Sequence, residues 1–205
     1  MATEQEFKFF LTRDQMAGLE RRVRREREPE ERLQVNYYYD TEDGLLRRRE
    51  ITLRARLTET YLELQYKRRL PQEGGFRRHE EWSRPLGQTL PGKLRLCAEA
   101  DGRGEKVLCV LQGALVTRRR RFRFSEGLQL DLDTNLYLGV CDWEAELEFC
   151  PGTEPAARSL LVSLGLEGAQ PSALGKAERF FHRLEEEDGG IYVPGEPWGE
   201  PDEGR

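Results

Sequence analysis

The stretches LQLDLDT (128–134) and DWEAELEF (142–149) decide the fold, because charged and apolar side chains alternate along both of them. Successive side chains of a β-strand point to opposite faces of a sheet. Asp131 and Asp133 would therefore share one face, and leucines would occupy the other. The two stretches predict strands that each have one acidic face and one apolar face.

The same alternation recurs along most of the chain, and it predicts a sheet built from consecutive strands. Further strands are expected at 3–10, 33–40, 51–57, 61–69, 74–86 and 114–124, and helices at 12–28, 91–100, 155–166 and 172–184. Consecutive strands with short links form antiparallel sheets, and about eight of them can close into a barrel with a narrow interior. We therefore predict an α+β fold, a closed eight-stranded antiparallel β-barrel with flanking helices.

The composition describes a highly charged chain with an acidic end. Of 205 residues, 37% are apolar and 35% are charged, and the formal net charge is −5. Residues 185–205 hold eight acids and one base, so the remaining body is nearly neutral but dense in both signs. This balance argues against a basic nucleic-acid-binding surface. We expect one domain at 1–187 and an acidic, disordered tail at 188–205.

No apolar run is long enough to span a membrane, and the first residues do not resemble a secretory leader. We therefore expect a cytoplasmic protein that has no membrane partner. The four cysteines have no spacing typical of a metal site, and only two histidines are present.

The charged faces allow two interpretations. In one, they face water, and Arg54, Arg56 and Glu146 are exposed. In the other, they face the inside of the barrel and line a tunnel with both signs of charge. Without a ligand such a tunnel is very costly, so it requires an anion that arrives with a divalent cation. Polyphosphate with Mg²⁺ or Mn²⁺ fits, because guanidinium groups hold phosphate oxygens and carboxylates hold hard cations.

EQEFK (4–8) resembles the ExExK signature of the CYTH domain family, also called the triphosphate tunnel metalloenzymes. It is followed, in family order, by NYYYDT, LRAR, LQYK, HEEW, VTRRR, LDLDT, DWEAELEF and GKAERFF. The resemblance extends from about residue 2 to 184 and is nearest to the stand-alone bacterial CYTH proteins. It implies a closed tunnel of eight strands that cleaves or cyclises triphosphate compounds with a divalent metal.

The resemblance also implies roles for individual residues. Gln65 stands where the family's T-x-K pattern has threonine, and Glu80 and the run 118–121 leave the register of two positions open by one residue. His79 and Glu148 are optional members of the site. The implied catalytic residues are Glu4, Glu6, Lys8 and Glu81. The implied substrate-binding residues are Lys8, Arg54, Arg56, Lys67, Arg119 and Lys176, and the implied metal ligands are Glu4, Glu6, Glu81, Asp131, Glu144 and Glu146.

These roles predict a hydrolase that needs Mg²⁺ or Mn²⁺ and acts on inorganic triphosphate. A narrow barrel has room for one small ligand, and the sequence identifies no aromatic pocket at its mouth. The expected partner is a small-molecule triphosphate, with no nucleic acid, and the chain is expected to be a monomer or a homodimer. The alternatives are a thiamine triphosphatase, a class IV-type adenylate cyclase, or a non-catalytic module that binds polyphosphate or a nucleotide.

Overall fold

The computed structural model describes residues 2–69, 77–97, 106–169 and 171–187, and only the backbone of residues 2–4, 77–79 and 187. The predicted tail at 188–205 lies outside the described residues. In chain order the elements are β1 (Ala2–Leu11), α1 (Arg13–Val23), β2 (Glu30–Asp40), α2 (Leu45–Arg48), β3 (Ile51–Leu57), β4 (Leu62–Arg69), β5 (Arg77–Pro85), β6 (Lys93–Cys97), β7 (Lys106–Ser125), β8 (Leu128–Tyr137), β9 (Val140–Phe149), α3 (Glu154–Ser163) and α4 (Lys176–Glu187).

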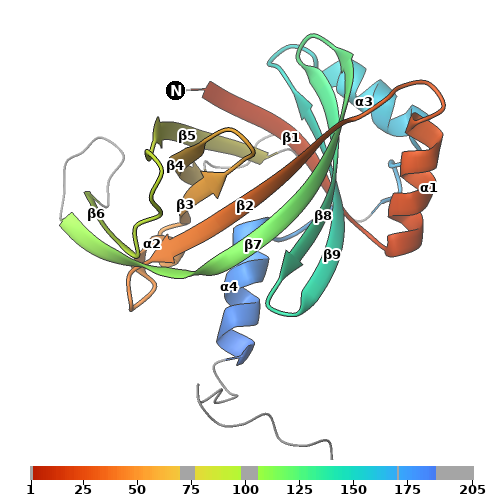
Figure 1. Cartoon of the computed structure of the whole chain (residues 1–205). Helices are drawn as coiled ribbons and strands as arrows, with labels where there is room; N and C mark the ends of the chain where they lie inside the picture. The colour runs from red at the N-terminus through yellow and green to blue at the C-terminus, as the bar shows by residue number, and fades with distance from the viewer. Residues whose placement is uncertain (1, 70–76, 98–105, 170, 188–205) are drawn as a thin grey trace, which may run out of the picture.

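Nine antiparallel strands form one strongly curled sheet in the order β2-β3-β4-β5-β1-β9-β8-β7-β6 (Figure 1). The long strand β7 also pairs with β2 through Glu30–Asp40, and the described pairing of β1 with β5 joins Ala2–Glu6 to Arg77–Glu81. The sheet curls into a half-barrel around its inner face (Figure 1). The prediction of an antiparallel, curled sheet is confirmed. The prediction of a closed eight-stranded barrel is corrected, because the sheet has nine described strands and is a half-barrel.

The predicted helix at 91–100 is wrong, because Lys93–Cys97 forms strand β6 and pairs with the start of β7. Leu94 and Leu96 alternate with Lys93 and Arg95, and both leucines pack against a buried apolar cluster. The period of two therefore prevails over the helix-compatible composition. The short helix α2 was not predicted; the Asp40 carboxylate accepts hydrogen bonds from the backbone N–H groups of Leu46 and Arg47 in it.

The apolar faces of the strands point outward and form the core beneath the covering elements. Helices α1 and α3 lie over one side of the curl (Figure 1), where Leu19 and Leu161 join a buried cluster with Leu132 and Leu147. A second cluster packs Leu53 and its neighbours on β3 and β4 beneath the segment that leads into β6. The charged faces consequently point inward.

Helix α4 is anchored by aromatic side chains at one end of the curled sheet. Phe180 is fully buried against Tyr38, Leu115 and Tyr137. A Cβ atom at Gly113 would lie 2.8 Å from the Phe180 ring, so glycine is needed for this close approach. The anchoring directs the first turn of α4 towards the inner face of the sheet.

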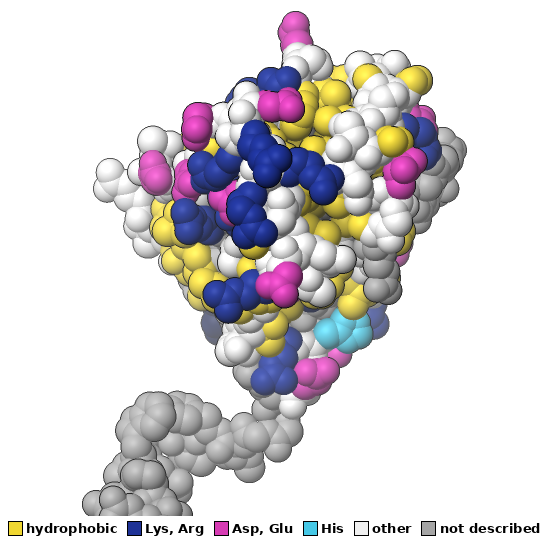
Figure 2. All heavy atoms as spheres, turned by 90° about the vertical axis from the view of Figure 1, so that its right-hand side faces the viewer, with side chains coloured by type: hydrophobic (Ala, Val, Ile, Leu, Met, Phe, Trp, Pro, Cys, Tyr) yellow, Lys and Arg dark blue, Asp and Glu magenta, His cyan; other side chains and the backbone are white. Residues whose placement is uncertain are grey.

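On the outside, basic and acidic side chains lie beside one another on the face that Figure 2 shows. Among the described surface pairs, Arg24 contacts Glu20, and Arg118 contacts Glu31. Such exposed pairs contribute little, about 0–1 kcal/mol each. Within the described residues, no helix is both long and apolar enough to cross a membrane.

Candidate active site

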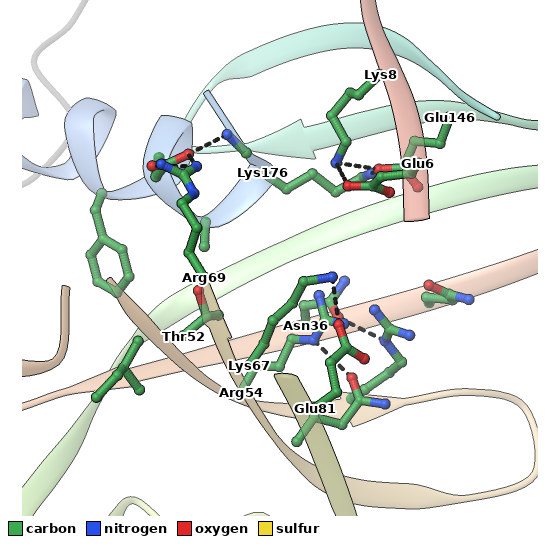
Figure 3. A pocket seen from close by; sticks show the side chains of 18 of the residues that line it. Glu6, Lys8, Asn36, Thr52, Arg54, Lys67, Arg69, Glu81, Glu146 and Lys176 are labelled. Atoms are coloured by element: carbon green, nitrogen blue, oxygen red, sulfur yellow. Dashed lines mark hydrogen bonds and ion pairs between the residues drawn. The ribbon is translucent and has the colours of Figure 1, made fainter. Parts of the chain in front are cut away.

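The inner face of the curled sheet encloses a cavity of about 740 Å³. Among the described residues, side chains from every strand except β6, and from α2 and α4, line it, and Figure 3 shows many of them in two facing groups. The interpretation in which the charged faces point to water is therefore wrong. Glu146 is only 4% exposed, and Arg54 and Arg56 are half-buried. The lining includes the predicted residues Glu6, Lys8, Arg54, Arg56, Lys67, Glu81, Arg119, Glu146 and Lys176.

One group is organised around Arg119 at the middle of β7. Its guanidinium nitrogens lie 2.6 Å from Asp131, 2.6 Å from Asp133 and 2.5 Å from Glu146. Asp131 and Asp133 have no exposed surface, so these charges are compensated only by protein groups. We call this group the β8–β9 wall; it comprises Glu6, Lys8, Arg119, Arg121, Asp131, Asp133, Asp142, Glu144, Glu146 and Glu148, with Lys176 and Arg179 of α4.

Helix α4 supplies two of the bases in this wall. Lys176 Nζ lies 2.8 Å from Asp133 and 2.8 Å from Glu146, and it also contacts Glu144. Arg179 lies 2.8 Å from Asp142 and 2.8 Å from Glu144. The anchored helix therefore completes the site rather than merely covering it.

Several groups of the wall have shifted pKa values. Burial opposes ionisation of Glu146, but Lys176, Lys8 and Arg119 outweigh it and hold the pKa of that carboxyl well below its usual range. Burial likewise opposes the charge on Lys176, but the carboxylates of Asp133, Glu144 and Glu146 raise the pKa of Lys176 well above its ordinary value. Glu146 and Lys176 are therefore both charged at neutral pH.

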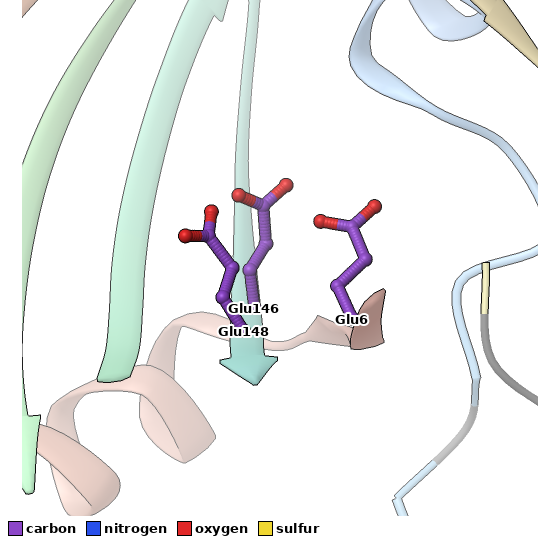
Figure 4. A group of neighbouring side chains, drawn as sticks. All are labelled: Glu6, Glu146 and Glu148. Atoms are coloured by element: carbon purple, nitrogen blue, oxygen red, sulfur yellow. The ribbon is translucent and has the colours of Figure 1, made fainter. Parts of the chain in front are cut away.

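The carboxylates of the β8–β9 wall offer two sets of oxygens for a cation. Oxygens of Glu6, Glu146 and Glu148 lie within 4.8 Å of one another (Figure 4), and so do oxygens of Asp133, Glu144 and Glu146. An ammonium group lies on each set, Lys8 on the first and Lys176 on the second. All three carboxylates of the first set line the cavity, whereas Asp133 and Glu144 do not, so the first set is the better candidate. Its oxygen ligands are those that Mg²⁺ and Mn²⁺ prefer.

The charge balance of the wall agrees with one divalent cation. Seven carboxylates face five bases, which leaves two excess negative charges among the described side chains of the wall. A single divalent cation would neutralise that excess. The donor set and the charge balance thus both fit such an ion.

The opposite group lies on β2, β3, β4 and β5, and it is arranged differently. Lys67 forms an ion pair of 2.5 Å with Glu81. Arg54 and Arg56 have no carboxylate within ion-pair distance among the described residues, and each donates instead to a side-chain amide. We call this group the β2–β5 wall; it comprises Asn36, Arg54, Arg56, Glu63, Gln65, Lys67 and Glu81.

Arg56 shows what this arrangement does to a buried cation. Burial, followed by repulsion from Arg54 and Arg119, lowers the pKa of Arg56 to about 9. The group still carries its charge at neutral pH, and Glu81 offsets that charge only in part. An anion in the cavity would relieve the repulsion.

The structure settles the two open registers and adds residues that were not predicted. Glu81 faces Lys67 in the cavity, while Glu80 pairs with Arg68 on the other face of the sheet. Arg119 points inward, and its neighbour Arg118 points outward to Glu31. The side chains of Glu4 and His79 lie outside the described part. Residues missed as site members are Asn36, Gln65, Arg121 and Asp133. For the two charged ones, their alternation with inward-facing neighbours was the available signal. Glu148, an optional member in the sequence analysis, lines the cavity.

The predicted metal ligands do not form one cluster. Glu6 and Glu146 belong to the first set of oxygens and Glu144 to the second, whereas Asp131 is held by Arg119 and Arg121. Glu81 lies on the opposite wall. The rim of the cavity also carries Tyr61, which is 49% exposed, and the exposed ring of His182. The sequence identified no aromatic pocket at the mouth, and Tyr61 and His182 are candidate residues for one.

The sequence profile of the CYTH domain matches residues 2–170. This chain belongs to the CYTH domain family. The match covers every strand of the half-barrel and ends before α4. A comparison with curated proteins gives no match.

Solved structures with the CYTH fold resemble this chain at low sequence identity. A candidate adenylate cyclase from Bacillus halodurans is 22% identical, with a TM-score of 0.65 over 88% of this chain and 100% of its own. A candidate adenylyl cyclase from Hippeastrum, described as having a dominant triphosphatase activity, is 21% identical, with a TM-score of 0.63 over 93% and 98%. Protein PH1819 from Pyrococcus horikoshii is 16% identical, with a TM-score of 0.60 over 88% and 99%. At these identities the likeness supports the fold alone.

Proposed function

We propose that this CYTH protein hydrolyses inorganic triphosphate in the cavity, with one Mg²⁺ or Mn²⁺ ion. The observation that carries the proposal is the pairing of two unlike walls across one cavity. The β8–β9 wall has excess negative charge for a cation, and the β2–β5 wall has two guanidinium groups without carboxylate partners. A triphosphate accompanied by a divalent cation needs both.

The cation would be held by Glu6, Glu146 and Glu148. When bound, it would neutralise charge on phosphate oxygens and polarise a water molecule. Arg54, Arg56 and Lys67 would bind the phosphate oxygens by charge-assisted hydrogen bonds. The half-barrel would hold the chain of phosphates straight, so that water is placed in line with the bond to be broken.

The reaction requires no covalent intermediate with the protein. Water attacks the terminal phosphorus, the bond from that phosphorus to the bridging oxygen breaks, and pyrophosphate leaves. A carboxylate of the first set, which comprises Glu6, Glu146 and Glu148, would accept the proton of the water. Fixed charges around the phosphates would supply most of the rate enhancement, because they need no reorganisation during the reaction.

A second substrate class is favoured by Tyr61. A half-exposed tyrosine on the rim could stack on a base or a thiazolium ring outside the phosphate site, as ATP and thiamine triphosphate would require. Stacking of this kind changes specificity modestly, by about 10–200-fold. Inorganic triphosphate remains our preferred substrate, because every one of its oxygens can use the charged walls.

Release of phosphate from inorganic triphosphate tests the proposal. We expect turnover with Mg²⁺ and none with excess chelator. Glu146→Gln should reduce turnover by orders of magnitude, because a carboxamide is a poor ligand for a hard cation. Glu167→Gln, in the turn after α3 and outside the cavity lining, should behave like the wild type. Full activity in chelator would refute the proposal.

A further inference from the structure

The two arginines of β3 are held by amide oxygens, whereas the described bases of the β8–β9 wall are held by carboxylates. Arg54 Nε donates to Gln65 Oε1 over 2.8 Å, and Arg56 Nε donates to Asn36 Oδ1 over 3.0 Å. No other protein acceptor contacts either guanidinium group within the described residues. The Nη groups are therefore the donors left for a ligand.

An amide and a carboxylate have different effects on an arginine. Both accept a hydrogen bond and fix the direction of the side chain. Only the carboxylate also cancels the positive charge, commonly through two parallel hydrogen bonds that occupy the donors of the guanidinium fork. Holding Arg54 and Arg56 by amides thus orients them and preserves both their charge and their free donors.

A third residue fixes the orientation of the Gln65 amide. The Gln65 Nε2 group donates to the Glu63 carboxylate, while Gln65 Oε1 accepts from Arg54. Because a carboxylate only accepts and a guanidinium only donates, the amide has one satisfied orientation. Asn36 needs no such relay, since it is only 1% exposed and is enclosed next to Arg56.

We propose that Asn36 and Gln65 are positioning residues, which direct Arg54 and Arg56 into the cavity and leave their charge available to triphosphate. This inference rests on the proposed triphosphate site. It also gives a reason for the glutamine at position 65, where the family pattern has threonine, because the longer amide reaches the Arg54 Nε group. Either residue would lose this role if it became acidic.

Two variants test the role while hardly changing shape. Asn36→Asp places a carboxylate against Arg56. The double variant Glu63→Gln with Gln65→Glu moves one carboxylate onto Arg54 and leaves the net charge unchanged. Gln88→Glu, on an exposed loop outside the cavity lining, is the control for an added negative charge.

The readout is the Kd of inorganic triphosphate, measured by titration calorimetry in chelator so that no metal is bound and no turnover occurs. We expect both test variants to bind about 10- to 100-fold more weakly, as for the loss of one charge-assisted contact, with unfolding midpoints no lower than that of the wild type. Gln88→Glu should bind normally.

Each outcome of this titration separates the inference from the proposed hydrolysis. If the wild type binds triphosphate but releases no phosphate with Mg²⁺, hydrolysis is refuted while the positioning role can still be confirmed. If both test variants bind triphosphate as tightly as the wild type, the inference is overturned. Loss of affinity together with a lower unfolding midpoint in both variants would also overturn it, because it indicates a purely structural role. Failure of the wild type to bind triphosphate overturns it as well.

Discussion

Replacing Arg119 by methionine should strongly destabilise the protein, whereas the same change one residue earlier should not. Arg119 compensates Asp131, Asp133 and Glu146 at 2.5–2.6 Å, and both aspartates are fully buried. Removing one partner of a buried ion pair typically costs about 3–5 kcal/mol, since it leaves the other charge uncompensated. Arg118 instead pairs with Glu31 at the surface, where such a pair contributes about 0–1 kcal/mol.

The assay is thermal unfolding in chelator, followed by circular dichroism. For a chain of this size, 1 kcal/mol corresponds to about 2–4 °C in Tm. Arg119→Met should therefore lower Tm by roughly 6–20 °C, and Arg118→Met by about 4 °C at most. Added Mg²⁺ should restore part of the loss in Arg119→Met, because the freed carboxylates gain a new partner. Equal Tm values for the two variants would refute the interior placement of Arg119.

Three further predictions follow from the same geometry. Glu148→Gln should weaken Mn²⁺ binding at least tenfold in a calorimetric titration, because the first set of oxygens loses one of its three carboxylates. An unchanged affinity would place the ion elsewhere. The pKa values of Glu146 and Asp133 are lower in the folded protein than in the unfolded chain, so the folded protein binds fewer protons at acidic pH. The Tm measured in chelator should therefore fall as the pH drops below about 4–5. A Tm that is constant down to about pH 3 would contradict this. Truncation after Glu187 should leave Tm and turnover unchanged, because residues 188–205 contain few apolar side chains to bury; an early melt would show that the tail docks.

The alternation of charge grouped the site residues on common strand faces, and the ligand argument and the family resemblance favoured the inward direction of those faces. Asp131 and Glu146 were expected to share an interior with Arg54, and the structure places all three inside the curl. The same reasoning failed at 91–100, where two leucines at a spacing of two were read as part of a short helix. Local pattern therefore predicted the inward faces better than it predicted the type of a short element.

Other features depend on contacts that a single strand does not encode. The curl of the sheet depends on pairings between strands far apart in sequence, such as Ala2–Glu6 of β1 with Arg77–Glu81 of β5. The position of Lys176 depends on Phe180 docking against Gly113, which brings the start of α4 to the acidic wall. The separation of Glu81 from Glu146 depends on which wall each strand occupies. These are properties of the assembled half-barrel.

The central claim is that the two charged walls together hydrolyse inorganic triphosphate. Parallel initial rates on inorganic triphosphate, ATP and thiamine triphosphate, each with Mg²⁺ and with chelator, test it most directly. We expect phosphate and pyrophosphate from inorganic triphosphate, with the highest kcat/KM of the three substrates and no turnover in chelator. Formation of cyclic AMP from ATP, a higher kcat/KM for thiamine triphosphate, or no turnover of inorganic triphosphate would contradict the claim.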